Sequence, residues 1–123
     1  MFKKYFTPQE ANKRLPLVST IVKELLQKGR NLKAIVDAAQ GKILPPESLL
    51  LQEEIENLMV ELEALGCFYK DWNFEIGLVD FPAMLNEQEV FLCWRSDEKN
   101  LRWYHGVEDG FIGRKLIPEN LLE

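Results

Sequence analysis

The single histidine of the chain, His105, has the chemistry best matched to neutral pH, because an imidazole ordinarily titrates close to it. Asp80 and Asp109 are carboxylates that a small sheet could bring next to this ring. Such a group could act as a general base or as a mixed histidine and carboxylate metal site. His105 and Asp109 lack the two-histidine spacing of zinc proteases, and the sequence supplies no evident third ligand. We therefore predict no metal ion and no cofactor, and a hydrogen-bonded structural histidine is the simpler interpretation.

Asp80 is unusual because it lies between two apolar residues, Val79 and Phe81, in a predicted strand. A carboxylate in such a strand has to be exposed, paired or hydrogen-bonded. Two interpretations stay open: an ion pair that fixes the edge of the sheet, and a ligand-binding role. A glycine-rich stretch before Arg114 could present backbone N–H groups to an anion, but its spacing is not that of a phosphate loop and a solvated turn is the simpler interpretation. The candidate ligand-binding residues, which we expect to cluster at one edge of the sheet, are Asp80, His105, Asp109 and Arg114.

The two cysteines, Cys67 and Cys93, are too few for a disulfide framework and lack partners at metal-ligand spacing. Strand alternation places Cys93 beside Phe91 on a packed face, which favours a buried free thiol over a nucleophile. Free thiols are typical of a reducing compartment. No apolar run has the length of a membrane span, and none follows the N-terminus as in a signal peptide. We therefore expect a cytoplasmic protein that does not associate with membranes.

Charge is distributed unevenly along the chain. The formal net charge is -5 and the isoelectric point about 5.0, which disfavours a nucleic-acid binder because such proteins carry a basic surface. Residues 1–40 contain eight Lys and Arg against three Asp and Glu, whereas residues 41–66 contain one against six. We expect two helices of opposite charge to lie side by side and to neutralise each other.

The first half of the chain has the period of a helical hairpin, over about residues 8–65. Thr7, Pro8 and Glu10 form a helix start with a capping box. Pro16 predicts a kink, or a short first helix followed by a longer one. Apolar positions then step by four and three residues: Ala11, Leu15, Val18, Val22, Leu25, Gly29, Leu32, Val36 and Ala39. A second helix is expected from about Glu47 to Leu65, with Gly66 as its left-handed cap.

Beyond Gly66 the period changes to the alternation of strands, over about residues 67–117. Residues 90–95 and 101–105 flank a polar turn and are predicted to form a hairpin. Residues 78–84 are a further strand, in which Pro82 requires an edge or a strand end, and residues 67–70 add a short one. We predict an α+β fold, a long antiparallel helical hairpin packed with a small antiparallel sheet, in a single domain spanning residues 1–123.

Several sequence blocks resemble a known family. They are Phe6-Thr7-Pro8, Glu10-Ala11-Asn12, Leu15-Pro16, Leu65-Gly66, Lys70-Asp71, the block from Gly77 to Ala83, Leu92-Cys93-Trp94-Arg95, Tyr104-His105, Gly110-Phe111 and Gly113-Arg114. In these blocks the chain resembles the uncharacterised prokaryotic family called domain of unknown function 2203 (DUF2203). The resemblance spans nearly the whole chain and implies a bacterial protein. It implies no activity, and Tyr104 stands where family members often have tryptophan.

We predict that the protein is a non-catalytic interaction or scaffold module that forms a homodimer through its helical hairpin. A helix from Pro16 to Ala39 is roughly 35 Å long, whereas short strands span only about 17–20 Å, so the sheet cannot cover the hairpin. Apolar residues flanking the seam would then stay wet in a monomer: Ile21, Leu26, Ile35, Leu49, Leu50 and Met59. The alternative is a small metal-binding protein or hydrolase-like enzyme with a histidine and aspartate site at the edge of the sheet. The lack of a catalytic signature favours a non-enzymatic role.

Overall fold

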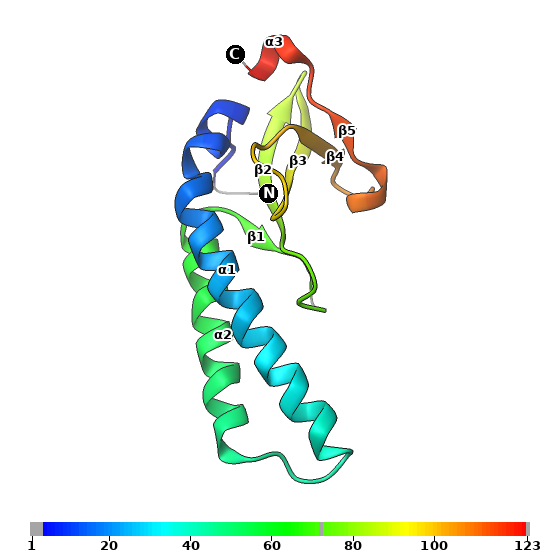
Figure 1. Ribbon diagram of the computed structural model, residues 1–123. Helices are drawn as coiled ribbons and strands as arrows, with labels where there is room; N and C mark the ends of the chain where they lie inside the picture. Colours follow the sequence, from blue (N-terminus) through cyan, green and yellow to red (C-terminus); the bar gives the residue numbers. More distant parts are fainter. Residues whose placement is uncertain (1–3, 72, 123) are drawn as a thin grey trace.

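The computed structural model describes residues 4–71 and 73–122, which form a helical hairpin followed by a sheet (Figure 1). The hairpin consists of α1 (Pro8–Ala39) and α2 (Pro46–Ala64). Five antiparallel strands follow in spatial order, β1 (Phe68–Tyr69), β2 (Leu78–Leu85), β3 (Gln88–Arg95), β4 (Trp103–Gly106) and β5 (Lys115–Leu116). A 3-10 turn, η1 (Phe111–Gly113), precedes β5, and α3 (Glu119–Leu122) ends the chain. The predicted α+β architecture is confirmed.

The start of α1 is the predicted capping box. The Thr7 hydroxyl accepts from the Glu10 amide at 3.1 Å, and the Glu10 carboxylate accepts from the Thr7 amide at 2.9 Å. The predicted short first helix does not form, because α1 continues through Pro16 without a break. Proline removes only one helical hydrogen bond, and Leu15 and Val18 on either side are buried in the core.

The end of α2 turns the chain from the hairpin into the sheet. Gly66 has a φ of +96°, its amide donates to the Glu63 carbonyl at 3.0 Å, and the Cys67 amide donates to the Leu62 carbonyl at 3.1 Å. This pattern is a Schellman motif, which satisfies the last carbonyls of the helix. The predicted glycine cap is confirmed, and the bounds of α2 agree with the prediction to within one residue.

The two faces of the sheet have different partners. Residues directly opposite in an antiparallel pair project to the same face, and neighbours along a strand alternate. One face packs on the helices and contributes to the core: Val79, Phe81, Ala83, Val90, Leu92 and Trp94. The face away from the helices carries the intervening residues: Leu78, Asp80, Pro82, Phe91, Cys93, Trp103 and His105.

Two features fix the position of β2. Its turn to β3 is the two-residue loop Asn86–Glu87, whose φ values of 51° and 66° match a hairpin turn of type I′. On its other side, β1 pairs with β2 only as far as Asp80. Pro82 lies beyond that point, and its carbonyl accepts from the Phe6 amide at 2.7 Å. The predicted edge position of Pro82 is therefore confirmed locally.

The hairpin extends past the sheet at its far end (Figure 1). The buried residues of α1 stop at Gly29, against which the Phe74 ring packs. Ile21 and Leu26, which the sequence predicts to be exposed to solvent, are only 9% and 8% exposed because they pack in the hydrophobic core. Leu49 and Leu50 are exposed, as expected.

No helix in the described part of the chain is long and apolar enough to cross a membrane.

Opposite charges on the two helices meet within the molecule. Lys28 of α1 forms an ion pair with Glu54 of α2, and both side chains are partly buried between the helices. Close charges of opposite sign on adjacent helices are the arrangement that the uneven charge distribution predicted.

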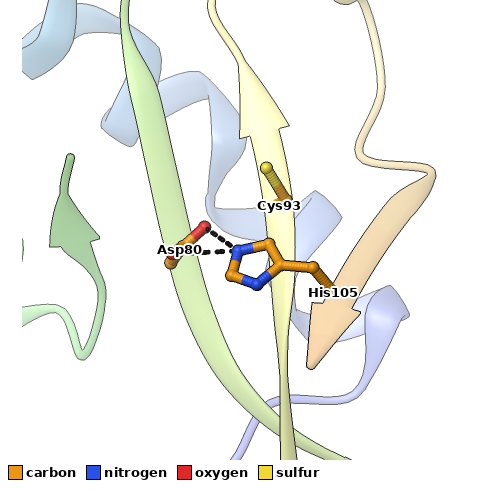
Figure 2. Close-up of side chains that lie close together, drawn as sticks. All are labelled: Asp80, Cys93 and His105. Carbon is orange, nitrogen blue, oxygen red and sulfur yellow. Dashed lines mark hydrogen bonds and ion pairs between the residues drawn. The ribbon is translucent and has the colours of Figure 1, made fainter. Parts of the chain in front are cut away.

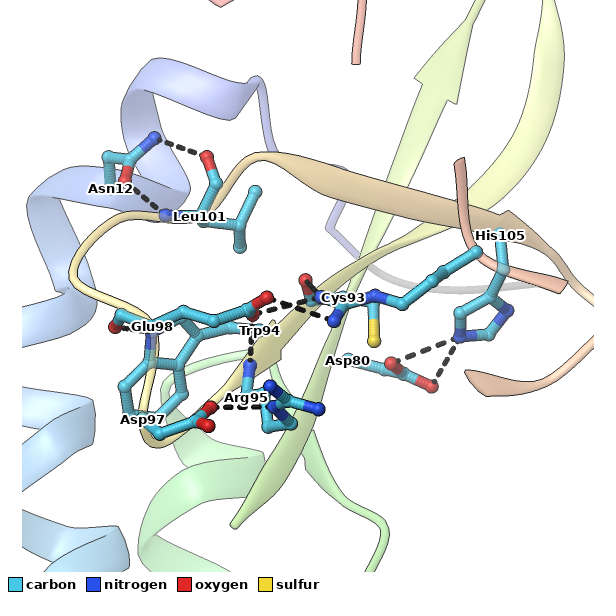
Figure 3. Close-up of polar contacts among 10 residues, drawn as sticks. Asn12, Asp80, Cys93, Trp94, Arg95, Asp97, Glu98, Leu101 and His105 are labelled. Carbon is cyan, nitrogen blue, oxygen red and sulfur yellow. Dashed lines mark hydrogen bonds and ion pairs between the residues drawn. The ribbon is translucent and has the colours of Figure 1, made fainter. Parts of the chain in front are cut away.

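A single side chain ties α1 to the start of β4. Asn12 Nδ2 donates to the Leu101 carbonyl at 3.1 Å, and Asn12 Oδ1 accepts from the Leu101 amide at 2.8 Å (Figure 3). The amide side chain thus satisfies both polar groups of a residue that is fully buried and lies just before β4. The β4 strand carries His105, so Asn12 helps to place this ring relative to the hairpin.

We expect Asn12→Ala to lower the free energy of unfolding by roughly 1–3 kcal/mol, because both Leu101 backbone groups lose their partner. Asn31→Ala is the matched control, since Asn31 is an exposed residue of the same helix and its replacement should change stability by at most about 0.5 kcal/mol. Urea unfolding of both variants measures the difference. Equal stability of the two variants would show that the Asn12 bridge contributes nothing net.

Candidate functional site

Three neighbouring strands bring Asp80, Cys93 and His105 together on the outer face of the sheet (Figure 2). Asp80 of β2 lies directly opposite Cys93 of β3, so the two side chains share a face. His105 of β4 lies opposite Phe91, two residues from Cys93 on the same face. Its ring can therefore reach diagonally toward both Cys93 and Asp80.

His105 and Asp80 form a buried pair, with the two side chains 4% and 6% exposed. The ring nitrogen Nε2 lies 3.2 Å from both carboxylate oxygens of Asp80, and Nδ1 lies 2.7 Å from the Gly106 carbonyl. A carbonyl can only accept, so Nδ1 carries a proton. A second proton must lie between Nε2 and the carboxylate for that contact to be a hydrogen bond. The pair is thus neutral overall, with a positive ring beside a negative carboxylate.

The pKa of His105 reflects opposing effects of its environment. Burial lowers it, but hydrogen bonds to Asp80, to Cys93 and to the Gly106 carbonyl outweigh burial and raise the pKa to about 10. The charged ring is therefore favoured in the folded protein across the neutral range. His105 is not poised near neutrality as a free imidazole would be, and a general-base role would require that the proton first be displaced.

The same three side chains have the composition of a metal site. One ligand atom from each of Asp80, Cys93 and His105 lies within 4.8 Å of the others. Ligands bound tetrahedrally to zinc at about 2.0–2.3 Å lie roughly 3.3–3.8 Å from one another. Small side-chain movements would be enough to bring a carboxylate oxygen, a sulfur and a nitrogen to those distances. Three protein ligands would leave a fourth position for water or a substrate.

A pocket opens above this cluster. Its volume is about 260 Å³, and Asp80, Cys93 and His105 lie in its lining. The remaining lining residues are mainly apolar, with one lysine: Lys70, Leu78, Phe91, Val107, Gly110 and Phe111. A small molecule in this pocket would therefore lie next to the cluster.

Of the four residues predicted to cluster, Asp80 and His105 are in direct contact, whereas Asp109 and Arg114 do not line the pocket. Asp109 Oδ2 accepts from the Gly106 amide at 3.2 Å and so closes the turn after β4. Arg114 donates to both carboxylate oxygens of Glu98 and to the Cys93 carbonyl, each at 2.9 Å. Both residues hold the backbone of the cluster.

Arg114 is further fixed by aromatic rings. Its guanidinium lies 4.7 Å from the ring centres of both Trp103 and Phe111. Glu98 also accepts from the Arg95 amide at 2.8 Å, and Arg95 pairs with Asp97 (Figure 3). Through Arg114, this network connects the turn after β3 to η1 and to the Cys93 carbonyl.

Cys93 is the residue that the sequence analysis missed. The thiol is free and buried, as predicted, but it faces His105 and Asp80 and adds a third side chain that could ligate a metal. The strand register could have identified Cys93 as a site residue, because pairing of Asp80 with Cys93 puts both side chains on one face. Cys67 lies instead in the core, where burial raises the pKa of its thiol to about 12. The two cysteines therefore have different environments.

The family model for an uncharacterized conserved protein, DUF2203, matches residues 4–117. The chain belongs to this family. The resemblance seen in the sequence blocks is thus confirmed, and the DUF2203 match includes all of Asp80, Cys93 and His105. No curated protein and no solved structure matches the chain.

The raised pKa of His105 predicts a stability change with pH. An unfolded histidine has a pKa of about 6.5, whereas that of the folded residue is about 10, so proton binding favours the folded state. The stabilisation is complete below about pH 6.5 and declines as the pH rises toward 10. In urea unfolding of chelator-treated protein, the stability difference between wild type and His105→Gln should shrink over this range. A difference that stays constant or grows would contradict the charged pair.

Proposed function

We propose that this protein binds a divalent transition metal of the zinc class through Asp80, Cys93 and His105. The observation that carries the proposal is the convergence of a thiol, an imidazole and a carboxylate at one buried point, from three neighbouring strands. Thiolate and imidazole ligands suit zinc and related metals, whereas magnesium and calcium prefer oxygen ligands. A small sheet with fixed register holds the three ligands without a flexible loop.

The surroundings of the three residues also fit metal binding. A ligating histidine almost always donates its other N–H to a carbonyl or carboxylate. His105 Nδ1 makes such a bond to the Gly106 carbonyl, which leaves Nε2 directed at Asp80 and Cys93. Arg114 donates to the Cys93 carbonyl and so holds the backbone of this residue. The metal would replace the proton shared by His105 and Asp80, so binding should strengthen as the pH rises.

A metal in this site would supply Lewis acidity at the bottom of the pocket and an acidic bound water. The chain's own residues would provide the walls around it and limit access of bulk water. Three protein ligands with a fourth coordination position open to a substrate would also suit a small hydrolase-like enzyme. The metal site itself, rather than a reaction, is the function we propose.

Cobalt(II) titration of chelator-treated protein tests the metal site. We expect one equivalent to bind with a thiolate-to-metal charge-transfer band, and zinc to displace it. Cys93→Ser should abolish this band, and His105→Gln or Asp80→Asn should weaken binding by more than about 100-fold. Cys67→Ala is the matched control, because this thiol lies in the core away from the cluster, and it should keep the band. No band in the wild-type protein, or loss of the band in Cys67→Ala alone, would contradict the proposal.

Self-association through the hairpin is a second candidate, favoured by an apolar hollow on α1 beyond the sheet. Its volume is about 250 Å³, and its lining includes Leu32, Val36 and Phe74. Val36 is 45% exposed although it continues the buried seam of the helix. A second copy is the occupant that fits best, since basic α1 and acidic α2 could pair across a two-fold axis as they pair within the chain.

Sedimentation equilibrium at micromolar concentration tests the homodimer. Val36→Glu places a charge in the apolar hollow, and we expect it to shift a dimer toward monomer by at least about tenfold in dissociation constant. Leu17→Glu is the control, because Leu17 is similarly exposed but lies at the other end of α1. A monomer mass for the wild-type protein would refute self-association, and equal effects of both changes would refute this site for it.

A further inference from the structure

We propose that the pocket above Asp80, Cys93 and His105 binds a small organic carboxylate whose acid group pairs with Lys70. The inference concerns the ligand of the same site and builds on the proposed metal site, which would form the floor of the pocket. The charge and the walls of the pocket, however, favour the same ligand in the metal-free protein. The two proposals can therefore fail separately.

The ionisable groups that line the pocket favour one negative charge in the ligand. In the metal-free protein, Asp80 and His105 form a pair that is neutral overall. With a divalent metal bound, carboxylate and thiolate ligands would balance its charge. In either state Lys70 is the remaining charged group of the lining, so the pocket is one positive charge in excess. A monoanion neutralises this charge, whereas a neutral or cationic ligand does not.

Lys70 is positioned to meet such an anion. Its backbone amide donates to the Leu78 carbonyl at 2.8 Å, which anchors the residue beside β2. The ammonium group lies 5.5 Å from the Phe91 ring centre and 5.9 Å from that of Phe68, close enough for cation–π attraction. No carboxylate is paired with Lys70 among residues 4–71 and 73–122. Its charge is held at the pocket and is available to a ligand.

The walls of the pocket indicate a compact, largely apolar ligand body. Phe91, Phe111, Leu78 and Val107 contribute apolar surface, and the volume of about 260 Å³ lies just below the range of roughly 300–1,000 Å³ that drug-sized ligands use. A phosphate group would need several donors and carries up to two charges. One lysine and apolar walls suit a carboxylate better.

Amide NMR titrations with benzoate, benzamide and inorganic phosphate test this inference in zinc-loaded and in chelator-treated protein. Benzoate is expected to shift the amides of Val107, Gly110 and Phe111. Benzamide has the same shape without the charge and should bind at least about threefold more weakly. Lys70→Gln should weaken benzoate binding to a similar degree, and Lys70→Arg should retain it. Lys42→Gln, at the exposed hairpin turn, is the control and should bind like the wild type.

The inference would be overturned by the absence of shifts at the pocket in either form of the protein, by equal binding of benzoate by wild type and Lys70→Gln, or by phosphate binding more tightly than benzoate. Equal affinity for benzoate and benzamide would likewise overturn it, because the charge would then play no part. Lys70-dependent benzoate binding in a protein that takes up no metal supports the inference and refutes the metal site. Metal binding without any benzoate response supports the metal site and refutes the carboxylate ligand.

Discussion

The register between β2 and β3 is the constraint on which the rest of the structure depends. The two-residue turn at Asn86 and Glu87 sets it, and every side chain of both strands takes its face from it. A slip by one residue would move Asp80 or Cys93 into the core and would bring apolar core residues to the outer face. The packing of Val79 and Phe81 against the helices therefore also enforces the meeting of Asp80 with Cys93.

Burial of the polar side chains at this cluster costs free energy, so only a specific set of partners can stabilise them there. A carboxylate and an imidazolium lose their hydration when they are enclosed, and only close pairing and further hydrogen bonds offset that loss. The Gly106 carbonyl supplies such a bond to His105, and Arg114 satisfies the Cys93 carbonyl nearby. Hydrophobic residues of similar volume would stabilise a small sheet at least as well. Folding stability alone therefore does not account for the polar cluster, and the metal site proposed above offers a reason for it.

Much of the fold could be predicted from the sequence, because local chemistry decides it. The capping box at Thr7, the seam of α1 and the glycine after Leu65 each determine a structure within a few residues of themselves. The site could be predicted only in part. Asp80 and His105 were conspicuous by residue type, but Cys93 joined them through cross-strand pairing, which depends on register rather than on sequence spacing. Arg114 was conspicuous too, yet its partners, Glu98 and the Cys93 backbone, are distant in sequence.

The sheet ends on both sides in strands of only two residues, β1 and β5. A strand so short offers few free backbone groups to an incoming chain, and along the rest of β2 Pro82 and its bond to the Phe6 amide occupy the exposed side. Short edge strands of this kind disfavour extension of the sheet by a second molecule, the route by which edge strands aggregate or capture extended peptides. A second copy of this protein would then have to contact the helices, as proposed above, rather than add strands to the sheet.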